Sequence, residues 1–347
     1  MRNSKLRALS ALGLAVVWLI VSGCGGSPPL NSDVPTTVPP VSPYYMDRDG
    51  VYQQQLEQSA SQQADPADAA TLRSLAGLSW ATWWNNESDL DTEIKSLLTE
   101  AHAANQRALI VVYRIPDRDC GSYSASGASK DEAAYLAELS RFAAMVKTTG
   151  QPVDAVFEPD AIAHMGDSRH AECLARNPHR FDMVRKAVSI LKSAPSIRVL
   201  LDAGNADWLP PTTMTPALMR SGLDLADGIA VNVSNFQWTN ASVSYAQKII
   251  DEMPDKLIMI DTSRNGLGPY RDGDANWAWC NPPDRALGPH TGSDTGHENV
   301  IYARIKLVGQ SDGECARAAP PSGDTRGYKA GDFVPLYAWE IATNSKK

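Results

Sequence analysis

Five aspartates follow short apolar stretches of the sequence, at points where a strand is expected to end. They are Asp119, Asp160, Asp202, Asp261 and Asp312. Carboxyl groups brought together at the ends of parallel strands can give and take protons, which is the chemistry of general acid–base catalysis. One aspartate in such a place is more often a helix cap or a turn residue. For five of them, several beside aromatic or glycine residues, we favour a shared site.

The stretches before these aspartates have the composition of buried parallel strands. Each is short, apolar and rich in β-branched residues, as is typical of strands covered on both faces. The expected strands are 108–113, 153–157, 197–201, 228–233, 257–260 and 300–307. Helices with 3.6-residue periodicity are expected between them, at 90–104, 131–147, 180–192 and 243–253. This alternation, without a GxGxxG motif, predicts an α/β fold, a closed or distorted parallel (β/α) barrel with its site at the carboxyl ends of the strands.

The start of the chain predicts export. Basic residues in 1–7 precede an apolar run at 8–21, which is short for a membrane-spanning helix. The run ends in small residues directly before Cys24, so residues 1–23 resemble a bacterial lipoprotein signal peptide and Cys24 is the expected site of lipidation. An ordinary signal peptide or a short anchor helix is the alternative. We therefore expect an exported protein, lipid-anchored on the outer face of the cell membrane.

Residues 24–43 form an expected proline-rich tether. They contain several prolines among glycine, serine and threonine, and such a segment cannot bury enough apolar surface to fold. Residues 44–347 then suit one large domain.

Charge and motif content exclude several function classes. The net charge is −8 and the mature part has no basic cluster, so nucleic acid is not an expected partner. The six histidines show no HExxH spacing, and there is no GxSxG motif. We expect no metal site, no cofactor and a monomeric protein.

The remaining cysteines suggest disulfides. If Cys24 carries lipid, an even set of four is left, Cys120, Cys173, Cys280 and Cys315. Exported proteins oxidise paired thiols, and four cysteines allow three connectivities. We expect neighbours in the sequence to pair, as Cys120–Cys173 and Cys280–Cys315.

Seven sequence blocks carry a family resemblance. They are residues 113–121, 157–160, 201–208, 232–236, 260–266, 279–282 and 306–313. In this order and approximate spacing they resemble glycoside hydrolase family 6, the inverting cellulases. The resemblance covers essentially all of the chain after the tether and implies the distorted barrel of that family.

The resemblance implies catalytic roles for three of the aspartates. Asp160 matches the general acid, Asp119 the aspartate that supports the acid and the proton path from the attacking water, and Asp312 the candidate base. Inverting hydrolysis needs a protonated carboxyl for the leaving oxygen and a carboxylate about 6.5–9.5 Å away that assists the water. Burial of Asp160 at the end of an apolar strand would raise its pKa and suit it to donate.

Other matching positions imply contacts with sugar. They are Tyr113, Arg118, Asp202, Trp208, Asn235, Trp279 and Lys306. An indole offers an apolar face to a pyranose ring, although core packing is the usual role of a tryptophan.

The sequence departs from the family at substrate-contact positions. Asn205 stands where the family usually has histidine, Phe236 where it has tyrosine, Gln310 where it has glutamate, and Arg304 near an expected tryptophan. Tyr52 is the nearest aromatic to an early stacking tryptophan. The default substrate is a β-1,4-glucan, with another polysaccharide as a credible variant.

The mode of attack follows from a loop length. Only Gly313 and Glu314 separate Asp312 from Cys315, whereas family members that work from chain ends carry a long loop there. An open cleft and endo-type cleavage are expected. The alternative function is a glycan-binding lipoprotein, either a pseudoenzyme or a sugar-binding protein.

Overall fold

The structure is a computed structural model that describes residues 42–121, 124–125, 127–271, 278–314 and 327–346. The chain divides into residues 1–38 and residues 39–347, and all described residues belong to the second unit. The expected signal peptide, most of the tether, Cys24 and Cys315 lie outside the described residues. No helix in the part of the chain described here is long and apolar enough to cross a membrane.

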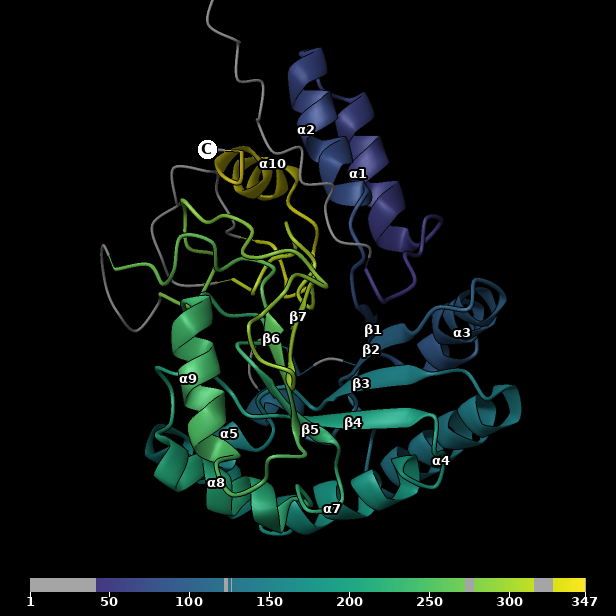
Figure 1. The fold of residues 1–347 in the computed structure, drawn as a ribbon, viewed down its shortest axis with the longest axis vertical. Helices are drawn as coiled ribbons and strands as arrows, with labels where there is room; N and C mark the ends of the chain where they lie inside the picture. The colour runs from purple at the N-terminus through teal and green to yellow at the C-terminus, as the bar shows by residue number, and fades with distance from the viewer. Residues whose placement is uncertain (1–41, 122–123, 126, 272–277, 315–326, 347) are drawn as a thin grey trace, which may run out of the picture. The chain divides into compact units, whose positions relative to one another are not determined.

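The core of the fold is one curled sheet of parallel strands in chain order (Figure 1). Its strands are β1 (Thr82–Trp84), β2 (Ala108–Val112), β3 (Val153–Phe157), β4 (Ile197–Asp202), β5 (Gly228–Val231), β6 (Leu257–Asp261) and β7 (Val300–Ala303). The ends of the sheet approach each other where the amide of Ala81 donates to the carbonyl of Arg304 at 2.9 Å. The prediction of a distorted parallel barrel is confirmed, and β1 is the strand that it missed.

Helices surround the sheet and join successive strands (Figure 1). They are α1 (Val51–Ser61), α2 (Pro66–Ala76), α3 (Glu93–Ala103), α4 (Glu132–Thr149), α5 (Ala163–Gly166), α6 (Ala171–Arg176), α7 (Arg180–Leu191), α8 (Pro211–Arg220), α9 (Thr239–Ile249) and α10 (Pro335–Asn344). Short 3₁₀ turns are η1 (Glu87–Leu90), η2 (Arg118–Gly121) and η3 (Ser168–His170). The four expected helices correspond to α3, α4, α7 and α9.

Local sequence explains where the longest of these helices begins and ends. The side chain of Asp131 accepts a hydrogen bond from the amide of Ala134 at 2.8 Å and caps the start of α4. Gly150 ends it in the left-handed conformation, with φ of 66°. Both signals are readable in the sequence, and the helix was predicted to within two residues.

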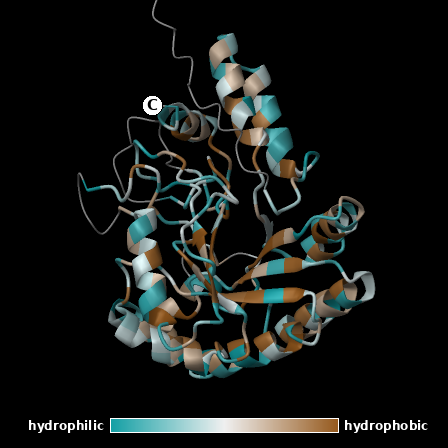
Figure 2. Ribbon diagram, in the orientation of Figure 1, coloured by the Kyte–Doolittle hydropathy of each residue, from teal (hydrophilic) through white to brown (hydrophobic). Residues whose placement is uncertain are grey.

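The strands carry mostly hydrophobic residues (Figure 2), and their two faces pack in different clusters. On β2, Ile110 packs outward against the helices, whereas Val111 packs into the interior of the sheet. The same alternation directs Tyr113, Asp202 and Asp261 inward, since each follows an inward residue by two positions. The interior face therefore delivers these side chains to the carboxyl end of the sheet.

The amino end of the interior is filled by an ionic cluster. Asp154, the second residue of β3, is fully buried and accepts a hydrogen bond from the hydroxyl of Tyr44 at 2.7 Å. Arg107 donates to the same carboxylate at 3.0 Å, and Arg198 at 2.6 Å. At this end the interior is filled by Asp154 and the two arginines that neutralise its charge. The carboxyl end of the sheet is therefore the end available for chemistry.

Candidate active site

Asp160 is placed by a tight turn after β3. Glu158 and Asp160 adopt φ of 52° and 69°, which non-glycine residues seldom do. The buried carboxylate of Glu158 accepts hydrogen bonds from the amides of Arg114 at 3.1 Å and Ile115 at 3.0 Å, which fixes the turn to the segment after β2. The strain is thus held by neighbouring structure, as is common at functional sites.

Asp160 meets Asp202 at the end of β4. The amide of Asp160 donates to Asp202 Oδ2 at 3.0 Å, and the amide of Gly204 donates to the same oxygen at 3.1 Å. Burial raises the pKa of Asp160 well above its ordinary value, and the charges of Asp202 and Asp119 raise it further. Burial also raises the pKa of Asp202 to about 7. The pair retains a proton at pH values where an exposed aspartate would be ionised.

Asp119 lies in the turn η2 and is partly open to solvent. Its side chain is 16% exposed, and its Oδ2 accepts the amide of Ser124 at 2.9 Å. Burial raises its pKa, while the hydrogen bond from Ser124 and the charge of Arg118 act in the opposite direction. The adjacent Cys120 forms the predicted disulfide with Cys173, with a Cα–Cα distance of 5.4 Å. The disulfide anchors the turn that presents the carboxylate.

An aromatic wall lies beside Asp119. The guanidinium of Arg118 stacks over the ring of Tyr113 at 4.2 Å, and the ring of Trp83 meets Tyr113 edge-on at 5.7 Å. Burial is the main cause that raises the pKa of Tyr113, and the nearby carboxylates Asp160 and Asp119 raise it further. The predicted residues Tyr113 and Arg118 therefore belong to the same cluster as the acids.

Asp312 is held by two cations. Arg264 donates to both of its carboxylate oxygens at 3.0 Å each, and Lys306 Nζ lies 3.5 Å away. The amide of Asn281 donates to Asp312 Oδ2 at 3.0 Å. Burial acts to raise the pKa of Asp312, but Arg264 and Lys306 outweigh it and hold the pKa below its ordinary value. Asp312 is therefore ionised, in contrast to Asp160.

The carboxyl groups described above and Lys306 lie close enough to influence the pKa of Asp160. Besides burial, Asp202, Asp119 and Asp312 raise the pKa of Asp160, and Lys306 lowers it. The structure thus brings together the three predicted catalytic aspartates with Asp202 and Lys306. Among the described residues, no group of three or more His, Cys, Asp or Glu side chains could hold a metal ion.

Asp261 has a structural role that differs from the expectation of a shared site. Its two oxygens accept four backbone amides, those of Ser234, Ser263, Ile305 and Lys306, at 2.9–3.2 Å. It ties the loops after β5, β6 and β7 together. With its oxygens so occupied, it positions Lys306 through the backbone instead of acting on a substrate.

The expected sugar-binding residues fall into two groups. Trp279 is 39% exposed and is the more open of the two expected tryptophans. Trp208 is partly buried and donates its indole N–H to Asp167 at 2.7 Å, so that donor is already used. The amide oxygen of Asn235 accepts the backbone amide of Phe236 at 2.9 Å. Trp238, which sequence reasoning missed, is 49% exposed at the start of α9.

The positions that depart from the family pattern have internal roles. The guanidinium of Arg264 stacks over Phe236 at 4.3 Å, so this buried ring supports the cation that holds Asp312. Asn205 accepts the amide of Asp207 at 3.0 Å and stabilises a turn. Gln310 pairs with Phe333 in an isolated antiparallel bridge. The early aromatic Tyr52 is buried and donates to the carbonyl of Val308 at 2.8 Å, so it offers no face to a sugar.

Sequence reasoning missed Trp83, His164 and Arg264. His164 Nε2 lies 3.8 Å from Asp119 Oδ1, and burial lowers its pKa to about 4, so it is a neutral neighbour of that carboxylate. Alternation along β1 could have found Trp83, because one of two adjacent tryptophans on a strand must face inward. No local sequence signal identified Arg264 as the partner of Asp312, which lies 48 residues away.

Comparison with known proteins agrees with this geometry. The family model for "Glycosyl hydrolases family 6" matches residues 41–345. The chain belongs to glycosyl hydrolase family 6. Endoglucanase A of Cellulomonas fimi is 34% identical over 293 residues, covering 83% of this chain and 59% of that protein. Endoglucanase 1 of Streptomyces halstedii is 30% identical, covering 98% of each chain.

Solved structures show the same fold. The endoglucanase Cel6 of Mycobacterium tuberculosis, in complex with methyl-cellobiosyl-4-deoxy-4-thio-β-D-cellobioside, has a TM-score of 0.74 at 32% identity. The match covers 88% of this chain and 98% of that one. The prediction of a family 6 glycoside hydrolase, endoglucanase-like in type, is confirmed.

Proposed function

We propose that this family 6 chain is an inverting, endo-acting hydrolase of β-1,4-glucan or a related polysaccharide, with Asp160 as the general acid. The observation that carries the proposal is the opposite electrostatic state of two neighbouring carboxyl groups. Burial and three carboxylates favour protonated Asp160, whereas Arg264 and Lys306 favour ionised Asp312. Paired carboxyl groups with separated pKa values are the requirement of inverting hydrolysis.

The reaction would proceed in one displacement. Asp160 gives its proton to the glycosidic oxygen as the bond from that oxygen to the anomeric carbon breaks. A water forms the new bond from the opposite face and releases a proton, so the anomeric configuration inverts. Asp119 is the better acceptor for that proton because burial raises its pKa. Asp312, bound by Arg264 and Lys306, is a weak base and provides negative charge beside the developing cation.

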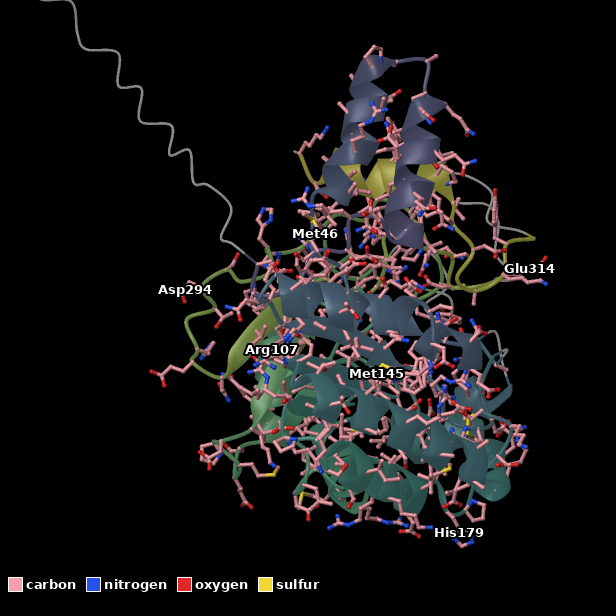
Figure 3. The ribbon with its side chains drawn as sticks, turned by 90° about the vertical axis from the view of Figure 1, so that its right-hand side faces the viewer. Met46, Arg107, Met145, His179, Asp294 and Glu314 are labelled. Carbon is pink, nitrogen blue, oxygen red and sulfur yellow. A yellow bond between two sulfur atoms is a disulfide. The ribbon has the colours of Figure 1, made fainter. Side chains whose placement is uncertain are left out.

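Endo-type attack is supported by the short segment after Asp312. Gly313 and Glu314 directly follow it, and Glu314 lies at the surface (Figure 3). The relatives named above that share at least 30% identity are endoglucanases by name. The binding-protein alternative is not favoured, because one curled sheet of the family 6 type replaces the two open lobes of a sugar-binding protein.

A substrate panel tests the function directly. Release of reducing ends should be measured on soluble β-1,4-glucan, mixed-linkage β-glucan and bacterial envelope glycans, together with solution viscosity. Endo attack predicts a steep fall in viscosity early in the reaction, at low release of reducing ends. Absence of hydrolysis on every polysaccharide, with tight binding of one, would favour the pseudoenzyme instead.

Asp202→Asn is expected to shift the alkaline limb of the pH profile of kcat/KM to lower pH. The amide keeps an oxygen acceptor for the amide of Asp160, but it removes the charge that raises the pKa of Asp160. The acid then loses its proton at lower pH, and activity falls earlier as pH rises. Asp224→Asn, at an exposed pair with Arg185, is the matched control. A limb that stays in place or moves upward would contradict this charge coupling.

We further propose that Cys24 carries lipid and anchors the catalytic domain to the outer face of the membrane through residues 24–43. The support is the apolar run followed by small residues and a cysteine. Labelled fatty acid should enter the wild-type protein in a bacterial host that processes lipoproteins and should not enter Cys24→Ala. Equal labelling of both proteins would overturn the proposal, and treatment with hydroxylamine, which cleaves thioesters, controls for nonspecific acylation of other cysteines.

A further inference from the structure

His164 lies on α5, directly after the turn that presents Asp160. Its backbone amide donates to the carbonyl of Asp160 at 3.0 Å, so the helical turn that carries the histidine begins at that aspartate. Its imidazole faces a different aspartate, because Nε2 lies 3.8 Å from Asp119 Oδ1. Only 9% of the side chain is exposed. The histidine therefore connects the turn of the proposed acid with the proposed proton acceptor.

Two aromatic rings hold the imidazole in this place. The indole of Trp208 meets it edge-on with the ring centroids 5.1 Å apart, and the ring of His170 lies at the same centroid distance. Both neighbours are bound in turn to Asp167, Trp208 through its indole N–H at 2.7 Å and His170 through Nδ1 at 3.3 Å. Packing against these fixed rings limits the rotation of the imidazole away from Asp119.

The surroundings of His164 favour one protonation state. Burial lowers its pKa to about 4, electrostatic repulsion from His170 and Arg180 lowers it further, and the charge of Asp167 acts in the opposite direction. The neutral imidazole carries one proton, on Nδ1 or on Nε2. Nδ1 is closed to solvent and has no hydrogen-bond partner among the described residues, so a proton there would be a buried unpaired donor. The favoured tautomer therefore carries its proton on Nε2, which faces Asp119.

The carboxylate of Asp119 has an oxygen that can accept this donor. Among the described residues, its Oδ2 accepts the amide of Ser124 at 2.9 Å, whereas Oδ1 accepts no hydrogen bond. At 3.8 Å, Nε2 is beyond hydrogen-bond distance of Oδ1. Hydrogen bonds of catalytic groups are often long in the free enzyme and shorten when substrate binds.

We propose that His164 is a positioning residue for the proton acceptor, with its Nε2–H directed to Asp119 Oδ1. This role rests on the proposed function, in which Asp119 accepts the proton of the attacking water. The N–H dipole attracts the carboxylate in the free protein, and the contact shortens to a hydrogen bond in the substrate complex. Ser124 and His164 then hold one oxygen each, and a second lone pair on each oxygen remains for the proton of the water. The imidazole itself stays neutral and transfers no proton.

Substitutions of His164 separate the donor from the shape of the ring. His164→Phe keeps an aromatic ring against Trp208 and removes the donor. Its kcat should fall about tenfold on polysaccharide and aryl substrate alike, with KM unchanged, because positioning of the acceptor is lost and binding is not. His164→Gln should restore most of kcat, since its Nε2 can replace that of the imidazole. His164→Asn is too short to reach Asp119 and should resemble His164→Phe, and the Gln–Asn comparison decides the question if the phenylalanine variant does not fold.

The acidic limb of the pH profile of kcat/KM provides a second readout. A donor to the ionised form lowers the pKa of a carboxyl group, so the pKa of Asp119 should rise in His164→Phe. Activity requires this carboxylate to be ionised, and the acidic limb should therefore move to higher pH. The other groups that act on the pair stay in place in every variant, and they are Arg118, Asp167, His170 and Arg180. His102→Phe, at an exposed position on α3, is the control and should change neither kcat nor the limb.

Carbon-13 NMR titration of the Asp119 carboxyl tests the contact without turnover. Its pKa should be higher in His164→Phe than in the wild type and in His164→Gln. An unchanged carboxyl pKa in His164→Phe would overturn the role of His164, whether or not the protein hydrolyses glucan. Equal losses of kcat in His164→Gln and His164→Phe would overturn it as well, because the shape of the ring would then matter and the donor would not. A raised carboxyl pKa in a protein without hydrolytic activity would support the contact and contradict the proposed function instead.

Discussion

Asp160→Ala is expected to reduce hydrolysis of a β-1,4-glucan by about 10²–10⁴-fold, the usual contribution of general acid catalysis. The variant leaves no group to protonate the departing oxygen. Its fold should persist, because the hydrogen bond to Asp202 comes from the backbone amide of residue 160 and survives the substitution. Initial rates on soluble polysaccharide, beside a thermal melt of both proteins, check the two statements.

An aryl cello-oligosaccharide separates loss of the acid from loss of the site. A nitrophenolate departs without a proton, so Asp160→Ala should retain much more activity on this substrate than on polysaccharide. The ratio of the two losses should be about the size of the acid contribution itself. Full polysaccharide activity in the variant would rule out Asp160 as the acid, and equal losses on both substrates would indicate damage to binding.

The scaffold creates this asymmetry between carboxyl groups that share one site. Asp160 is buried and lies near the negative charges of Asp202 and Asp119, so its neutral form is favoured. Asp312 is as deeply placed, yet two donors from Arg264 and one cation from Lys306 favour its charged form. The same residue type therefore performs two functions because the sheet presents it in two environments.

The sheet was predictable because its strands are buried on both faces. Runs such as 153–157 are recognisable because a strand covered on both faces needs apolar residues at nearly every position. β1 was missed because it has three residues, and two of them are the tryptophans Trp83 and Trp84. Helices α1 and α10 were missed for a different reason. Both helices pack against α2 in an apolar cluster separate from the core of the sheet. In addition, α1 has glutamines at positions where an amphipathic pattern needs apolar residues.

The site was predictable where an aspartate ends a strand or lies in the turn after one. Asp202 is the last residue of β4, Asp160 lies in the turn after β3 and Asp119 in the turn after β2, and the order of the surrounding blocks pointed to their roles. Arg264 was not found, although it decides the charge state of Asp312, because the contact depends on how two loops pack. Asp261 shows the converse error, since a strand-end aspartate can serve the backbone instead of a substrate.

Asp119→Asn and Asp312→Asn are expected to fail in different ways. Asp119 accepts one backbone amide in a partly exposed turn, and the amide oxygen of asparagine can keep that hydrogen bond. This variant should unfold like the wild type, yet lose activity on polysaccharide and aryl substrate alike, because either reaction needs the water's proton removed. A loss of about 10²-fold or more is expected on both. Initial rates on the two substrates, with urea unfolding of the same preparation, provide the measurement.

Asp312→Asn should instead lose stability. Arg264 is fully buried, and its two hydrogen bonds to Asp312 compensate its charge. Removing the negative charge leaves two cations uncompensated, which costs about 3 kcal/mol of unfolding free energy when a buried pair is broken. Arg185→Gln, at the exposed pair with Asp224, is the control and should change little. If Asp119→Asn kept its activity while Asp312→Asn lost activity on both substrates, Asp312 would be the proton acceptor. The product anomer, followed by NMR from the first turnovers, should be inverted in every active variant, because both assignments leave the direction of water attack unchanged.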